Sequence, residues 1–211
     1  MSCVIVMGCY RTGTSAVAGI LHHLGVNMGE NFQEPNVQNP KGFFEDPEFV
    51  EANLKMYEGS CTGDNSNMIE GKNLFYGLCI KRQKLSWSSD DDGHWGFKDP
   101  KFCLTAKHVE LHSDSKIIWI HRDIDETALS IIKSLGLHGA DANMDKWRTF
   151  VKHYRDETRE FTNGILTGTL SKPILHLSLS KLLAAPRTYI SEIAHFIGSD
   201  TTQEAFDFME Q

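Results

Sequence analysis

Near its N-terminus the chain reads Val4-Ile5-Val6-Met7-Gly8-Cys9-Tyr10-Arg11-Thr12-Gly13-Thr14-Ser15. The apolar run at its start predicts a buried strand over residues 3–7, and the apolar spacing after it predicts a helix over 14–24. The glycines between the two elements permit a tight turn and a close approach of the backbone. A strand, a glycine loop and a helix N-terminus in this order present backbone N–H groups to a phosphate. The stretch therefore predicts a nucleotide-binding edge on a sheet.

The same loop matches the nucleoside-triphosphate loop, G-x-x-x-x-G-K-[ST], only in part. Gly8 and Gly13 have the required spacing, and Ser15 holds the last position. The lysine position, however, is Thr14. That lysine normally reaches the β- and γ-phosphates, so its absence weakens an ATP or GTP interpretation. The cation of this loop is Arg11 instead.

A second strand-to-helix junction also carries an arginine. Residues 116–121 form the clearest apolar run and end just before Arg122. Asp123 and Glu126 then resemble a capping box, which predicts a helix to about residue 135. Ser130 lies in that helix, eight residues after Arg122. An arginine offers a forked set of donors to a phosphate, and the serine hydroxyl can lie beside it.

The remaining pattern alternates strands and helices. Further strands are expected over 95–98 and 173–177. Helices are expected over 47–57, 71–87, 100–112, 145–165 and 204–209. A long loop is expected over 26–46 and a solvated loop over 88–93, while the pattern assigns no element to 59–70. Such alternation favours a parallel sheet with both faces covered. We therefore expect one domain over 1–211, an α/β fold of three α/β/α layers with a central parallel sheet and a P-loop-like nucleotide-binding core. Ligands in such folds bind at the carboxyl ends of the strands.

The composition excludes several classes of protein. The formal net charge of −7 argues against a general nucleic-acid binder, which needs a basic face. Apolar residues make up 40%, which is enough for a packed core, yet no apolar run is long enough for a membrane span. The N-terminus lacks a basic segment, so no signal peptide is expected. The five cysteines form no C-x-x-C pair and ten histidines form no H-E-x-x-H motif, which favours reduced thiols in a cytoplasmic protein and no metal site.

Taken together, the two junctions resemble the sulfotransferases that use 3′-phosphoadenosine 5′-phosphosulfate (PAPS). Residues 11–15 fit the family's loop, [KR]-[ST]-G-T-[ST], at every position, and Arg122 and Ser130 match the family's 3′-phosphate pair in type and spacing. The resemblance continues in residues 39–45, 96–101 and 175–198. Two departures stand out. Leu179 replaces a common tyrosine, and the glycine-rich 3′-phosphate loop near the C-terminus of cytosolic members is absent.

The resemblance implies PAPS as the sulfuryl donor, PAP as the product and no required metal. It assigns Arg122 and Ser130 to the 3′-phosphate. It also implies that the first loop holds the 5′-phosphosulfate through Gly8, Tyr10, Arg11, Thr12, Gly13, Thr14 and Ser15. The acceptor is expected to be a small molecule or glycan with a hydroxyl or amine.

The implied chemistry is an in-line displacement in which charge develops on the leaving phosphate oxygen, so catalysis rests on positioning and on cations. Arg11 is the first candidate for stabilising the leaving group, and Lys98 is a second cation over the sulfuryl oxygens. The histidine base of cytosolic relatives is replaced by Pro100. Glu45 is therefore the first candidate for the general base, with Glu34 and Glu30 as alternatives.

Two other functions stay open at the level of sequence. A P-loop kinase or NTPase-like phosphotransferase is favoured by the glycine spacing and opposed by Thr14. A non-catalytic relative that binds PAP or PAPS is favoured by the missing histidine and the missing C-terminal loop. PAP binding without magnesium would separate the first of these from the sulfotransferase interpretation.

Overall fold

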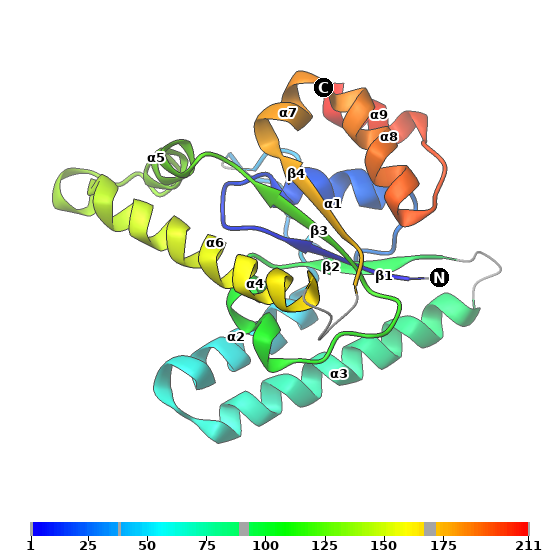
Figure 1. The fold of residues 1–211 in the computed structure, drawn as a ribbon, viewed down its shortest axis with the longest axis horizontal. Helices are drawn as coiled ribbons and strands as arrows, with labels where there is room; N and C mark the ends of the chain where they lie inside the picture. The colour runs from blue at the N-terminus through cyan, green and yellow to red at the C-terminus, as the bar shows by residue number, and fades with distance from the viewer. Residues whose placement is uncertain (1, 38, 89–92, 167–171, 211) are drawn as a thin grey trace.

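The computed structural model describes residues 2–37, 39–88, 93–166 and 172–210. Within them, four strands form one sheet in the order β2-β1-β3-β4, and each neighbouring pair is parallel. The strands are β1 (Cys3–Met7), β2 (Trp95–Lys98), β3 (Lys116–His121) and β4 (Ile174–Ser178). The predicted parallel sheet is thereby confirmed. Since all four strands run the same way, their carboxyl ends meet at one edge (Figure 1).

The helices follow the strands in the alternating order that the sequence predicts (Figure 1). They are α1 (Thr14–His23), α2 (Pro47–Thr62), α3 (Asn65–Ser88), α4 (Phe102–Thr105), α5 (Ile124–Ser134), α6 (Met144–Leu166), α7 (Leu179–Ala184), α8 (Pro186–Ile197) and α9 (Gln203–Glu210), with short 3-10 helices at Ala106–His108 and Gly139–Ala142.

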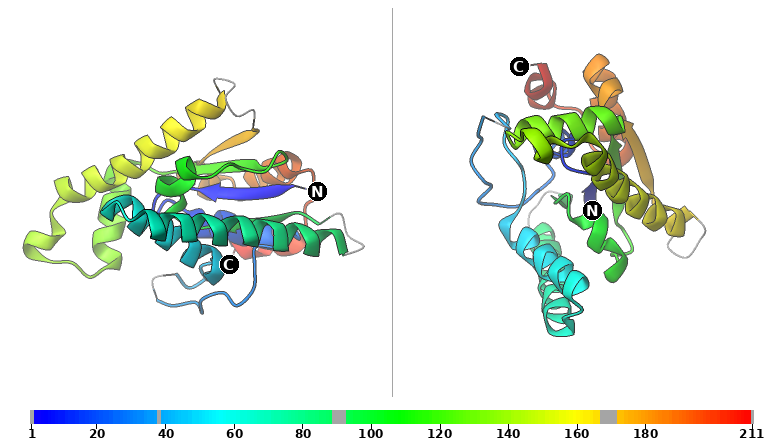
Figure 2. Two further views of the ribbon diagram at one scale, coloured as in Figure 1. Left: turned by 90° about the horizontal axis from the view of Figure 1, so that it is seen from below. Right: turned by 90° about the vertical axis from the view of Figure 1, so that its left-hand side faces the viewer.

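The alternation of side chains along β1 divides the core into two layers. Val4 and Val6 pack in one cluster with residues of α1, α8 and α9. Ile5 and Met7 point to the other face and pack with residues of α2, α3, α4 and α6. Every residue of β1 is buried, as expected for a central strand of a covered parallel sheet. The three-layer arrangement of the prediction is therefore present, and Figure 2 shows the helices on both sides of the sheet.

The helical hairpin of α2 and α3 lies beside β2, the edge strand (Figure 2). Asp46 caps α2 by accepting a hydrogen bond from the Glu48 amide at 3.0 Å, and Pro47 follows in the first turn. Both helices are longer than predicted. α3 includes residues 65–70, where the polar sequence gave no periodic signal, because much of this edge helix faces solvent and only part of it reaches the core.

The helix predicted over 100–112 is wrong in length. α4 ends at Thr105 and is followed only by one 3-10 turn. Residues 102–106 are all buried, so this segment has no solvent-facing side. Val109 and Leu111 are buried while residues 110 and 112 are exposed, which is the alternation of extended chain rather than helix.

The loop predicted over 88–93 falls mainly on residues 89–92, which lie outside the described residues. No helix among the described ranges is long and apolar enough to cross a membrane. All five cysteines are free thiols, and Cys3, Cys9 and Cys103 are buried.

Candidate functional site

The loop after β1 is shaped by close packing against the next strand. A Cβ at Gly8 would lie 2.6 Å from the carbonyl oxygen of Ile120 in β3, which is too close for any other residue. The Gly8 amide donates to the Cys103 sulfur at 3.2 Å, and the Thr12 hydroxyl donates to the Cys9 carbonyl at 2.6 Å. The loop is therefore fixed at both ends.

Two residues of this loop have left-handed backbone conformations. Gly13 has φ 98°, and a Cβ there would lie 2.6 Å from the Leu179 side chain. Arg11 has φ 65°, which is uncommon for a residue with a side chain. This conformation directs the guanidinium to the carboxyl edge of the sheet, where its Nε donates to the Ser130 hydroxyl at 3.3 Å. Backbone strain held in place by the surrounding structure is typical of functional sites.

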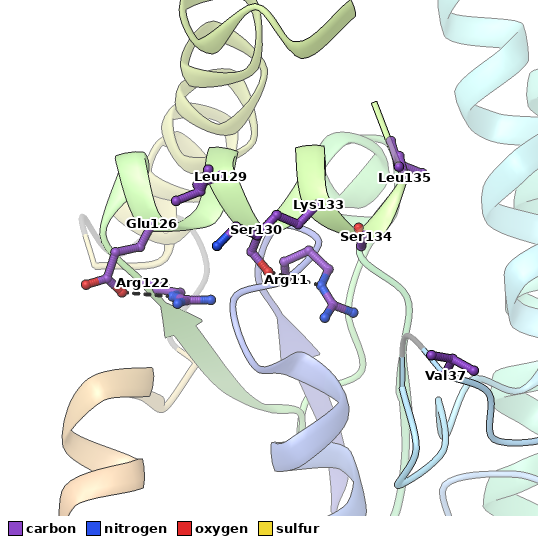
Figure 3. Close-up of a pocket in the computed structure, with 10 residues that line it drawn as sticks. Arg11, Val37, Arg122, Glu126, Leu129, Ser130, Lys133, Ser134 and Leu135 are labelled. Carbon is purple, nitrogen blue, oxygen red and sulfur yellow. Dashed lines mark hydrogen bonds and ion pairs between the residues drawn. The ribbon is translucent and has the colours of Figure 1, made fainter. Parts of the chain in front are cut away.

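Two adjacent pockets open at this edge. The larger, of about 780 Å³, is lined by Arg11, Arg122, Ser130 and further residues of α5, with Val37 on its other side (Figure 3). The smaller, of about 200 Å³, is lined by the first residues of α1 together with Asn39 and Leu179. Arg11, Arg122 and Ser130 line both. The two spaces therefore form one site that begins at a helix N-terminus and continues along α5.

The N-terminus of α1 is well suited to an anion. Gly13, its cap residue, provides no side-chain acceptor for the first amides of the helix. Thr14 and Ser15 line the smaller pocket, so these amides adjoin it. Backbone N–H groups and the helix dipole at such an end favour negative charge.

On the α5 side, Arg122 follows β3 as the sequence predicts. Its Nε donates to a carboxylate oxygen of Glu126 at 3.0 Å, and the side chain stays 28% exposed. Asp123 caps α5 by accepting from the amides of Asp125 and Glu126. The predicted Arg122 and Ser130 are thus brought to one pocket (Figure 3).

An ion pair between a buried lysine and a partly exposed glutamate adjoins the first loop. The Lys98 ammonium at the end of β2 contacts a Glu45 carboxylate oxygen at 2.6 Å and donates to the Ser15 hydroxyl at 3.1 Å. Only 1% of the Lys98 side chain is exposed. Burial lowers the pKa of Lys98, while Glu45 and Asp99 oppose that shift. The arrangement connects two predicted catalytic residues with the phosphate-binding loop.

Glu45 is placed by its neighbour Asp46, whose side chain forms a buried ion pair with Arg82 of α3. Both of these side chains are less than 5% exposed. A Cβ at Gly29 would clash with the Asp46 side chain, so the start of the long loop packs closely against its end. The other two candidate bases, Glu30 and Glu34, are exposed, and the structure does not bring them to Lys98.

Tyr10 lies apart from the two pockets. Its ring packs against Phe150 and Tyr154 of α6, with the Lys101 ammonium 5.9 Å from the ring centre. Its predicted role in holding the donor can therefore come only from its backbone in this conformation. Burial raises the pKa of its hydroxyl more than Lys101 lowers it.

Asp99 acts in the structure as a buried anchor. It accepts hydrogen bonds from the Asn53 side chain at 3.2 Å and from the Lys101 amide at 2.9 Å. Burial raises the pKa of this carboxyl, and Lys101 is the main opposing influence. These contacts hold the turn after β2, and with it Lys98, against α2.

Some lining residues were not predicted from the sequence. Asn39 and Leu179 line the smaller pocket, and Leu129 and Lys133 line the larger one. Lys133 lies one helical turn after Ser130, so the three-residue spacing was a usable signal. Leu179 is marked in the sequence only as the replacement of a common tyrosine, and its place in the smaller pocket depends on how β4 and α7 pack.

A model described as the sulfotransferase family matches residues 3–203. The chain belongs to the sulfotransferase family. The predicted sulfotransferase is thereby confirmed, and the phosphotransferase alternative is not favoured. No curated protein matches the chain.

Solved sulfotransferases share the fold at low sequence identity. Sulfotransferase STF1 from Mycobacterium tuberculosis H37Rv is 14% identical with a TM-score of 0.55, over 100% of this chain and 71% of that one. The sulfotransferase domain of the curacin biosynthetic pathway is 12% identical with a TM-score of 0.56, over 97% and 76%. The corresponding domain of the Synechococcus PCC 7002 olefin synthase is 16% identical with a TM-score of 0.53, over 97% and 76%. These structures support the three-layer fold.

Proposed function

We propose that this sulfotransferase moves the sulfuryl group of PAPS to a hydroxyl or amine of a small-molecule or glycan acceptor, with the roles of its residues as predicted from the sequence. One observation carries the proposal. Arg11, Arg122 and Ser130 line two adjoining pockets that start at a helix N-terminus, next to the ion pair of the buried Lys98 with Glu45. A Cβ at Gly8 or Gly13 would clash with Ile120 or Leu179, so the loop requires glycine at both positions, and Gly13 lines the smaller pocket.

The donor supplies an activated sulfuryl group, and the chain supplies position and charge. Amides of residues 12–15 and the α1 N-terminus hold the 5′-phosphate, with the Thr14 and Ser15 hydroxyls beside them. Arg11 stabilises the negative charge that develops on that phosphate as its bond to sulfur breaks. Arg122 and Ser130 hold the 3′-phosphate.

Lys98 and Glu45 act on the other side of the sulfuryl group. Lys98 offsets the negative charge on the sulfuryl oxygens, and its hydrogen bond to the Ser15 hydroxyl keeps it beside the phosphate loop. Glu45 accepts the proton of the acceptor as the new bond to sulfur forms. The Lys98–Glu45 contact orients the carboxylate before the acceptor binds.

The test is calorimetric titration with PAP in metal-free buffer, compared with ATP plus magnesium. We expect micromolar PAP binding, weak ATP binding and a loss of about tenfold or more in PAP affinity for Arg122→Ala. Arg187→Ala is the matched control, because Arg187 of α8 is exposed and lines neither pocket. Wild-type PAP affinity in Arg122→Ala would remove the 3′-phosphate assignment, and tighter ATP binding would favour the phosphotransferase.

Arg11→Ala tests the catalytic half of the proposal. We expect it to abolish sulfuryl transfer to a panel of phenols, alcohols, amines and sugars. PAP binding by the wild type without transfer to any of these acceptors would support the non-catalytic relative instead.

A further inference from the structure

One face of α5 forms the wall of the larger pocket. Glu126, Leu129, Ser130 and Lys133 line it at spacings of three and four residues, so they lie on one side of the helix. Figure 3 shows Ser130 and Lys133 on the side of α5 that faces the Arg11 and Arg122 guanidinium groups. The wall carries two charges of opposite sign, and among the described residues that line the pocket no other is acidic.

The cationic side chains around the pocket differ in whether they already have a partner. Arg122 is already paired with Glu126, and the Arg11 Nε donates to Ser130. Lys133, by contrast, has no ion-pair partner among the residues that the structure describes. A phosphate monoester carries a charge of about −1.5 to −2 at neutral pH. A single arginine that shares its charge with a carboxylate does not neutralise such a group.

We propose that Lys133 is a specificity-determining residue that binds the 3′-phosphate of the nucleotide together with Arg122 and Ser130. This inference rests on the proposed function, since it concerns the same nucleotide. It adds a residue, and a reason for the preference of this chain for a nucleotide phosphorylated at the 3′ position.

Glu126 has the opposite effect in the same proposal. Its ion pair with Arg122 links residues four apart in the sequence, and the Glu126 side chain is 59% exposed. Exposed pairs of this kind contribute little to stability, so a phosphate can replace the carboxylate on Arg122 at small cost. Glu126 therefore holds the Arg122 side chain in the pocket before the nucleotide arrives and reduces phosphate affinity afterwards.

The experiment compares PAP with adenosine 5′-monophosphate, which lacks the 3′-phosphate, by calorimetry at low salt. For Lys133→Met we expect PAP affinity to fall about tenfold and monophosphate affinity to stay within about twofold. Lys133→Arg should keep most of the preference, and Glu126→Gln should raise PAP affinity several-fold. Lys84→Met is the matched control, since it removes the same charge from an exposed position on α3.

The outcomes separate this inference from the proposed function. An unchanged ratio of PAP to monophosphate affinity in Lys133→Met would overturn the role of Lys133 while leaving PAP binding intact. An equal loss for both ligands would also overturn it, because the effect would not depend on the 3′-phosphate. Wild-type protein that does not bind PAP, or does not prefer it to the monophosphate, would contradict the proposed function itself.

Discussion

Lys98 and Arg122 lie at the same edge of the same sheet, yet their surroundings differ. Lys98 is 1% exposed and contacts Glu45, which lies far from it in the sequence. Arg122 lies just before α5, is 28% exposed and pairs with Glu126 in the first turn of that helix. A buried charge with a fixed partner is preorganised and does not rearrange during the reaction. An exposed charge with a weakly held partner can exchange that partner for a ligand.

The difference suggests a division of labour along the site. The end near β2 is rigid, because Asp46 and Arg82 hold Glu45 in place, and Asp99 and Asn53 hold the turn after Lys98. The α5 end is open, with a pocket of about 780 Å³. Under the proposed function, the chemistry belongs to the buried end and nucleotide selection to the open one. Substitutions at the two ends should have different consequences.

The largest effect is expected from breaking the buried anchor. Arg82→Met leaves the Asp46 carboxylate buried without its partner, which should lower the free energy of unfolding by about 3–5 kcal/mol. Lys81→Met, at the preceding residue, breaks only the exposed pair with Glu48 and should cost at most about 1 kcal/mol. Urea unfolding of both variants measures the contrast. Equal losses would show that burial does not distinguish the two pairs.

The second effect concerns catalysis rather than stability. Lys98→Met should lower the rate of sulfuryl transfer by about 10²–10³-fold, because it removes a preorganised cation from the reacting group. PAP lacks the sulfuryl group, so its affinity should change by no more than about twofold. Rates and PAP titrations on one preparation test this split. A parallel loss of PAP binding would mean that Lys98 holds the nucleotide or the loop instead.

The third effect tests how tightly the phosphate loop is packed. Gly13 and Gly25 both have positive φ, but only at Gly13 would a Cβ meet another side chain, that of Leu179 at 2.6 Å. Gly13→Ala should therefore destabilise the protein by about 1–3 kcal/mol more than Gly25→Ala, and it should also weaken PAP binding. Thermal unfolding and titration of both variants give the comparison. Equal destabilisation would assign the whole cost to backbone strain.

Much of this fold could be predicted from local sequence signals. The first loop was predictable because residues 8–15 are contiguous and their glycines and helix start are local signals. Arg122 and Ser130 were predictable for the same reason, since they belong to one strand-to-helix junction. The polar part of α3 escaped prediction because an exposed edge helix has little apolar periodicity. The predicted helix over 100–112 failed because a fully buried segment has no amphipathic pattern to mark its end.

The contacts between segments that are distant in the sequence were harder to predict. The sequence context favours Glu45 as a base, but its contact with Lys98 depends on how the loop over 26–46 crosses the edge of the sheet. The anchor that fixes this crossing, Asp46 with Arg82, joins two segments with no common motif. The direction of the Tyr10 ring was likewise decided by packing on α6. Such features follow from tertiary packing and not from local pattern.

The smallest effect is a shift on the pH axis. Burial lowers the pKa of Lys98, so this group loses its proton at a pH below the ordinary lysine value of about 10.4. The rate of sulfuryl transfer should therefore fall at alkaline pH before that value is reached. PAP binding should change less than the rate across the same range, because the arginines that line its pocket remain charged.

Lys98→Arg provides the control for this pH profile, since its guanidinium does not titrate there and the alkaline fall should disappear. The sign for stability is the opposite of the sign for activity. Between the lowered pKa and the ordinary value the unfolded chain binds more protons at this position, so stability should rise with pH while activity falls. Rates and unfolding free energies measured over the same pH series would show the two trends diverging. An alkaline fall that persists in Lys98→Arg would assign the titration to another group.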